Sequence, residues 1–233
     1  MHIPDGFVSP QTYLPATLLA AGAWAWAARG LRATLHEDML PRLAMLTALA
    51  YALGLVMLPL PGASSGHVLG VAMLGLLFGV RLAFLAYSLV LALQALLFGA
   101  GGITTLPLNA LLIGLLGAVT AVAVFRLLRP VHETAAVALA AWASVMVSAL
   151  ALGGMLALQP LLAQAPDGTP RYFPFGWQVV LPALLLPHLA IACAEALLTV
   201  LVWRHARRRR WVGQAASHAD ASAHTPAMGS AAE

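Results

Sequence analysis

The first two residues of the chain, Met1 and His2, bring three nitrogen donors together. They are the Met1 amine, the His2 backbone amide once it has lost its proton, and one ring nitrogen of His2. Three nitrogens close to one plane suit Ni(II) or Cu(II), and Co(II) with some distortion. A fourth donor from elsewhere in the chain would complete a four-coordinate metal site.

His67 is the best candidate for that fourth donor. It follows the small residues Ser64, Ser65 and Gly66, which leave room for another segment to approach. A lone loop histidine more often has no metal role, but neutral imidazole is a common ligand. The topology below places His67 on the same side of the membrane as Met1 and His2. Metal must displace the proton of an amine with a usual pKa of about 7.7–8.0, so we predict an affinity that falls steeply in acid.

Several other polar residues are candidates for supporting the donors. Asp5 stands before Gly6, a pair typical of turns, so it is either a turn former, a partner for an imidazole or a ligand. Polar groups expected at or near the outer loops are Ser65, Gln94, Thr104, Thr105 and Asn109.

His188 and Glu195 lie seven residues apart in an apolar stretch, hence on one helix face. Ionisable residues inside a membrane are costly and usually face the interior. We expect them to lie deeper than the loop site. They form a structural polar pair or contact a partner, and a relay for metal is the less favoured alternative.

The chain shows none of the motifs of a hydrolytic enzyme. It has no H-E-x-x-H, Walker A or G-x-S-x-G sequence. Cys193 is the single cysteine, so neither an intrachain disulfide nor a thiolate cluster can form. We therefore expect a protein that is not an enzyme, has no prosthetic group, and needs a partner for any uphill transport.

The composition is that of a polytopic membrane protein. Of 233 residues, 61% are hydrophobic and 9% are charged, whereas soluble domains carry about 25% charged residues. We expect an all-α bundle of seven transmembrane helices. Their approximate ranges are 13–28, 42–58, two short helices in 68–98 that meet at Gly79–Arg81, 107–128, 134–158 and 177–203. Trp177 begins the last range and Trp203 ends it, and tryptophan at both ends of a span is typical of interfacial anchors.

Arginine positions predict the orientation of the bundle. With seven spans and the N-terminus outside, eleven arginines lie inside and only Arg171 lies outside, as cytoplasmic loops prefer. The excess of arginine over acidic residues thus reads as a topology signal and not as a nucleic-acid surface. We expect a multi-pass protein of the cell (inner) membrane with a cytoplasmic C-terminus. Residues 1–210 form its membrane domain, and 211–233 form a disordered tail. We expect no removable signal peptide, because no positively charged segment begins the chain.

The motifs resemble those of the CbiM/NikM family, the substrate-capture subunits of energy-coupling factor transporters for cobalt and nickel. The resemblance rests on Met1-His2-Ile3-Pro4-Asp5-Gly6-Phe7, on Ser65-Gly66-His67-Val68-Leu69-Gly70, on the run from Gln94 to Thr104, on Asn109, and on His188 to Leu197. It implies an N-terminus inserted into an outward pocket, with Co²⁺ or Ni²⁺ as transported substrate held by Met1, His2 and His67. It also implies a transmembrane coupling subunit, two cytoplasmic ATP-binding subunits and often a small accessory membrane subunit.

Two alternatives use the same ligands. One is an intramembrane metalloenzyme with His188 and Glu195 as acid–base groups, but catalysis needs an open coordination position and four nitrogens would leave none. The other is a metal-gated channel or sensor, which would work without ATP-binding partners. The residue types favour nickel slightly and do not decide between nickel and cobalt.

Overall fold

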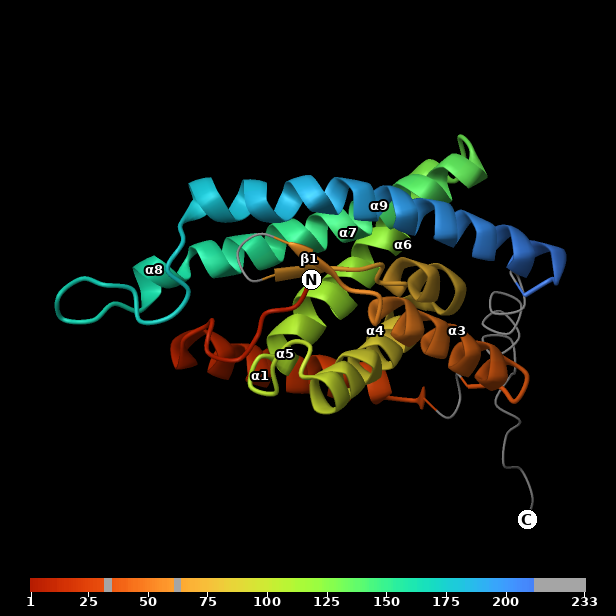
Figure 1. Ribbon diagram of the computed structural model, residues 1–233. Coiled ribbons are helices and arrows are strands. Elements are labelled where there is room, and N and C mark those ends of the chain that lie inside the picture. The colour runs from red at the N-terminus through yellow and green to blue at the C-terminus, as the bar shows by residue number, and fades with distance from the viewer. Residues whose placement is uncertain (32–34, 61–63, 212–233) are drawn as a thin grey trace, which may run out of the picture.

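A computed structural model describes residues 1–31, 35–60 and 64–211 of the chain, and the described part is mostly helical (Figure 1). The tail predicted to be disordered, 211–233, lies outside the described residues except for Trp211. The helices and strands in chain order are α1 Pro10–Ala28, α3 Met39–Gly54, β1 Leu58–Leu60, β2 Ser64–Gly66, α4 Val71–Phe98, α5 Leu106–Asn109, the π-helix η1 Ala110–Leu115, α6 Leu116–Leu128, α7 Glu133–Ala157, α8 Gln159–Leu162 and α9 Trp177–Arg208.

The two helices α7 and α9 lie side by side along most of their length, and α6 packs against α7 (Figure 1). The buried face of α7 is made largely of small residues, such as Ala136, Ala140, Ser144 and Ala149. Small side chains let helix backbones approach closely where lipid gives little hydrophobic drive for association. The closely packed helices α6, α7 and α9 thus form one side of the bundle.

The long apolar stretch after His67 forms α4, and it breaks where the sequence predicts. Gly79 has φ 81° and ψ 168°, a backbone conformation that interrupts the helix and that glycine adopts without strain. Two residues later, the Arg81 guanidinium donates a hydrogen bond from Nη2 to the Ala27 carbonyl at 3.1 Å. Arg81 therefore binds the last turn of α1, which places the break in α4 level with the end of that helix.

Four of the described helical segments are long and apolar enough to cross a membrane. These segments are Val71–Phe98, Leu106–Leu128, Glu133–Leu162 and Trp177–Arg208, and α3 is apolar but shorter. The count of seven spans and the orientation of the two ends stay predictions.

Three details differ from the expectations. Residues 58–60 and 64–66 form two short antiparallel strands, in which Leu58 pairs with Gly66, where the end of a helix and a loop were expected. We call this pair of strands the hairpin. Helix α9 continues beyond Trp203 to Arg208. Trp203 is buried and donates a hydrogen bond from Nε1 to the Glu133 carboxylate at 3.0 Å, so it packs inside the bundle and is not an interfacial anchor.

Candidate metal site

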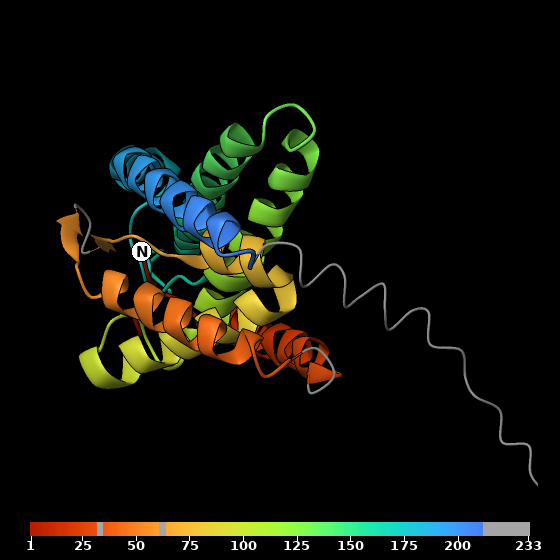
Figure 2. The same cartoon turned by 90° about the vertical axis from the view of Figure 1, so that its right-hand side faces the viewer.

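The N-terminal segment lies inside the bundle. In Figure 1 its end is seen between the α7–α9 layer and the layer that holds α1 and α5, and Figure 2 shows it beside the hairpin. Met1 is 1% exposed, His2 9% and Ile3 0%. A chain end carries a charged amine in water, so burying it is costly unless the amine becomes neutral or is bound.

Asn109 and Thr105 hold the backbone of Ile3. The Ile3 amide donates to Asn109 Oδ1 at 2.9 Å, and Asn109 Nδ2 donates back to the Ile3 carbonyl at 3.0 Å. The same carbonyl accepts from the Thr105 hydroxyl at 2.6 Å. Both polar groups of Ile3 are thus satisfied in a buried place, and the residues before it are fixed in position.

Asp5 anchors the next turn of the segment to the loop before α5. Its carboxylate accepts hydrogen bonds from the Ile103 and Thr104 amides, both at 2.9 Å, and from the Thr104 hydroxyl. Partial burial raises the pKa of the Asp5 carboxyl, but the bonds from Thr104 and from the loop amides outweigh it and hold the pKa below its usual value. Asp5 therefore fixes the backbone of the N-terminal segment against this loop. Because its carboxylate oxygens accept hydrogen bonds from the loop, the structure does not favour Asp5 as a metal ligand.

Gly102 lets the loop come close to Asp5. A Cβ atom at Gly102 would overlap the Asp5 carboxylate and would lie 2.5 Å from the Asp5 backbone nitrogen. The glycine-rich sequence 99–102 thus makes a close approach between two backbones possible.

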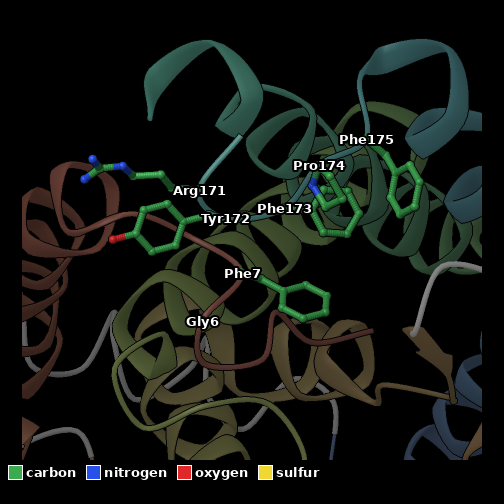
Figure 3. A pocket seen from close by; sticks show the side chains of 7 residues that line it. All are labelled: Gly6, Phe7, Arg171, Tyr172, Phe173, Pro174 and Phe175. Carbon is green, nitrogen blue, oxygen red and sulfur yellow. The ribbon is translucent and has the colours of Figure 1, made fainter. Parts of the chain in front are cut away.

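Two further contacts fasten the segment as it leaves the site. The Ser9 amide donates to Gln159 Oε1 at 2.9 Å, and the Phe173 amide donates to the Phe7 carbonyl at 3.3 Å. The Phe7 and Phe173 rings lie 5.3 Å apart. Figure 3 shows these two rings near each other in the pocket formed by residues 6–7 and 171–175, while Arg171 extends away.

His67 meets His2 at the end of the hairpin. The two ring centroids lie 4.7 Å apart at an interplanar angle of 34°. His67 Nδ1 lies 2.9 Å from the Val68 carbonyl, which can only accept, so Nδ1 carries the proton and Nε2 has a free lone pair. Metal-binding histidines commonly donate their other ring N–H to such a group.

Three buried ring nitrogens at this meeting point have no hydrogen-bond partner among the described residues. They are His2 Nδ1, His2 Nε2 and His67 Nε2. Buried polar atoms are nearly always paired, so an unpaired cluster requires an explanation. A bound cation that accepts lone pairs supplies one.

The protonation states suit a cation. Burial lowers the pKa of the Met1 amine from 8.0 to about 5. Burial also lowers the pKa of His2 well below its usual 6.5, helped by the positive charges of the amine and His67. For His67, burial and then the amine lower the pKa to about 3, against the Val68 carbonyl, which raises it. At neutral pH the amine and both imidazoles are therefore neutral, and each of these three groups offers one lone pair.

Glu195 holds the loop that carries His67. Its two carboxylate oxygens accept from the Leu69 and Gly70 amides, each at 2.7 Å. Leu69 and Gly70 stand immediately before α4, where the backbone amides have no partner within the helix. His188 instead donates from Nδ1 to the Leu184 carbonyl at 2.6 Å. The two residues share a buried face of α9 and make separate contacts, so they do not hydrogen-bond to each other.

Gln94 is the remaining buried polar residue of this region. Both of its amide atoms lack a partner among the described residues, and it packs against Gly54, where a Cβ would overlap its amide nitrogen. The same Cβ position lies 3.6 Å from His67 Nδ1. Gln94 thus lines the surroundings of His67.

The structure separates the predicted site residues into groups. It brings Met1, His2 and His67 together, surrounds them with Asn109, Thr105 and Gln94, and links Thr104 to them only through Asp5. The Ser65 side chain lies outside the described part of the chain. In the described residues no three His, Cys, Asp or Glu side chains could hold one ion.

Sequence reasoning missed Gln159 and Phe173. Gln159 follows the apolar run of α7 and is fully buried, and its amide also donates to the Thr12 hydroxyl at 3.1 Å. A lone glutamine at the end of an apolar helix is a weak signal. Phe173 acts through its backbone amide, which no side-chain motif reveals.

Comparison with known proteins places the chain in a family. A family model, CbiM, described as the cobalt uptake substrate-specific transmembrane region, matches residues 2–212. The chain is 36% identical over 214 residues to a protein of Lactiplantibacillus plantarum named as a fused nickel transport protein, LarMN, covering 89% of this chain and 65% of that protein. It is 32% identical to the fused nickel transport protein NikMN of Rhodobacter capsulatus, covering 85% and 59%. The chain thus spans less than two thirds of the length of these two relatives.

A solved structure shares the fold. The crystal structure of a truncated transition metal transporter superposes with a TM-score of 0.86 at 31% identity, covering 90% of this chain and 99% of that one. The family model, the relatives and the long apolar helices agree with each other. The chain belongs to the CbiM family and is a multi-pass membrane protein.

Proposed function

We propose that this protein captures Co²⁺ or Ni²⁺ on the outer side of the membrane and delivers it for import driven by ATP. The ion binds four nitrogens: the Met1 amine, the ionised His2 amide, His2 Nδ1 and His67 Nε2. The observation that carries the proposal is the cluster of buried, unpartnered imidazole nitrogens beside a buried amine whose pKa is about 5.

The donor set fits these ions better than the alternatives. Nitrogen donors suit nickel, copper and cobalt, whereas Mg²⁺ and Ca²⁺ prefer oxygen. Four filled positions leave none open for a substrate, which favours capture over catalysis. The names of the relatives, which refer to nickel and cobalt transport, agree with this choice.

The arginines support an outward direction of capture. Arg204 and Arg207–Arg210 follow the last predicted span, and cytoplasmic ends prefer such residues. The chain has no ATP-binding motif, so we assign the energy to partners: a transmembrane coupling subunit and two cytoplasmic ATP-binding subunits, with a small accessory membrane subunit as a further component.

The proposal is tested by extending the chain before Met1, so that the terminal amine no longer lies beside His2. We compare the native chain with a variant that has three extra residues before Met1 and with a control that has three extra residues after Glu233. A single added residue would make His2 the third residue and create a new chelate of one amine, two amides and one imidazole. The extension turns the Met1 amine into an amide and should abolish stoichiometric binding of Ni²⁺ and Co²⁺, measured as metal content of the purified protein. The control should bind like the native chain.

Undiminished binding by the N-terminally extended variant would remove the chelate from the proposal. Co-purification with two ATP-binding proteins separates import from a metal-gated channel or sensor, which would need no such partners. Titration of the native chain with each ion ranks nickel against cobalt.

A further inference from the structure

His188 is a buried histidine with one ring nitrogen unused. It lies on α9, is 0% exposed, and donates from Nδ1 to the Leu184 carbonyl one turn earlier at 2.6 Å. That bond leaves Nε2 as a lone pair, and Nε2 has no partner among the described residues. A histidine that serves only packing has no need of a free lone pair in a buried place.

The same arrangement occurs at His67. Each of these two histidines donates its Nδ1 proton to a backbone carbonyl, of Val68 or of Leu184, and leaves Nε2 free. Such a carbonyl fixes the tautomer and orients the ring, as it does for histidines that bind metals. His188 is therefore prepared as a ligand in the way that His67 is.

His188 lies next to the candidate site and not within it. Leu184, its hydrogen-bond partner, lines a small cavity with Met1, His2 and Ile3. Since no three His, Cys, Asp or Glu side chains in the described ranges could hold one ion, His188 does not join His2 and His67 around it here.

Polar residues continue along the same face of α9. Glu195 and Thr199 follow His188 by seven and eleven residues and are both buried. These spacings keep all three on one side of a helix. Further along the face comes the end of α9 that carries Arg204, Arg207 and Arg208.

We propose that His188 Nε2 receives the metal ion when it leaves the N-terminal chelate, as the first donor on the polar face of α9 formed by His188, Glu195 and Thr199. This role rests on the proposed function. In the transfer step the bond from His67 Nε2 to the metal breaks and a bond from His188 Nε2 forms. One neutral imidazole replaces another, so no proton moves in that exchange. The bonds from the metal to Met1 and His2 break afterwards, and the His2 amide then takes back one proton from water.

The experiment compares binding with uptake. The full chain is expressed with its coupling and ATP-binding partners as the native protein, as His188→Gln, as His188→Cys and as the control Ser148→Ala. Ser148 is as buried as His188, and its hydroxyl likewise lacks a partner among the described residues, but it lies on α7. Metal content of the purified chain and uptake of radioactive Ni²⁺ or Co²⁺ by cells are both measured.

We expect His188→Gln to bind metal within about threefold of the native protein and to lose roughly tenfold or more of the uptake, a loss typical of a removed metal contact. His188→Cys, which offers a thiolate donor, should recover part of the uptake. Ser148→Ala should match the native protein in both measurements. Metal content also reports whether each variant folds, since binding needs His2 and His67 assembled.

Three results would overturn the role of His188. The role is excluded if His188→Gln takes up metal as fast as the native protein. It is also excluded if the His188→Gln and His188→Cys variants show the same uptake. Binding lost in both variants assigns His188 to the capture site or to the fold instead. A native chain that binds no metal, or binds it without uptake, overturns the proposed function itself and is recognised because the native protein then fails too.

Discussion

At the scale of single residues, the buried chain end explains much of the chemistry. A charged amine and two imidazoles could not lie together without repulsion, and burial lowers the pKa of each. Neutral nitrogens then face one another at the distance of touching rings, 4.7 Å between the His2 and His67 centroids. The site is thus prepared for a cation before any cation arrives.

The pH dependence of metal affinity follows from these values. At an ordinary N-terminal amine, protons would compete with the metal below about pH 8. The Met1 amine instead has a pKa of about 5, and His67 has a pKa of about 3. Between pH 8 and 6 only the His2 amide proton leaves on binding, so affinity should fall about tenfold per pH unit. Below about pH 5 the amine also takes up a proton and the fall should steepen.

Equilibrium titration with Ni²⁺ at several pH values measures this slope. If affinity falls about a hundredfold per pH unit between pH 8 and 6, two protons leave on binding, and the Met1 amine is then not buried in solution. A flat profile over the same range would mean that the amide keeps its proton and is not a ligand.

At the scale of the elements, the site depends on a join between α9 and the start of α4. Glu195 accepts from the Leu69 and Gly70 amides at 2.7 Å, and His67 stands two residues before Leu69. In Glu195→Gln one oxygen becomes an NH₂ group that cannot accept, which leaves a buried amide unpaired at a cost of about 1–3 kcal/mol. His67 should lose its position, and metal affinity should fall by roughly 10–100-fold.

The matched control is Glu133→Gln. Glu133 also accepts from neighbouring groups, Trp203 and Arg207, at the opposite end of α7 from Leu152 and Leu156, which line the cavity beside Met1 and His2. Calorimetric titration should find native affinity in this control. If both variants bind alike, Glu195 has no part in placing His67.

The elements also show what the sequence could predict. The pairing of Met1 and His2 with His67 needed only ligand chemistry and the counting of spans, and the break at Gly79 needed only helix length. The pairing of 58–60 with 64–66 was not predictable, because each strand has only three residues and the sequence carries prolines at 59 and 61. The contacts of Gln159 and Phe173 depend on tertiary approach between distant segments, which periodicity does not encode.

At the scale of the whole molecule, the N-terminal segment connects elements that are far apart in the chain. Ile3 bonds to Asn109, Ser9 to Gln159 and Phe7 to Phe173. A ligand that binds only the folded state stabilises it by about 2.7 kcal/mol at a hundred times its dissociation constant. We expect Ni²⁺ to raise the melting temperature of the native chain and to leave that of the N-terminally extended variant unchanged.

Thermal unfolding of detergent-solubilised protein, with and without metal, checks this expectation. Mg²⁺ at the same concentration serves as control, because it prefers oxygen ligands and should have no effect. An equal rise in both chains would indicate metal bound somewhere other than the chain end.

The bond from Ser9 to Gln159 spans 150 residues, and that from Ile3 to Asn109 spans 106. During synthesis residues 1–9 leave the ribosome long before these partners exist, and Phe173 comes later still. At about 5–20 residues per second, the delay is about five to thirty seconds. The segment made first is thus among the last to find its place, and a nascent chain shorter than about 173 residues has no finished site to load.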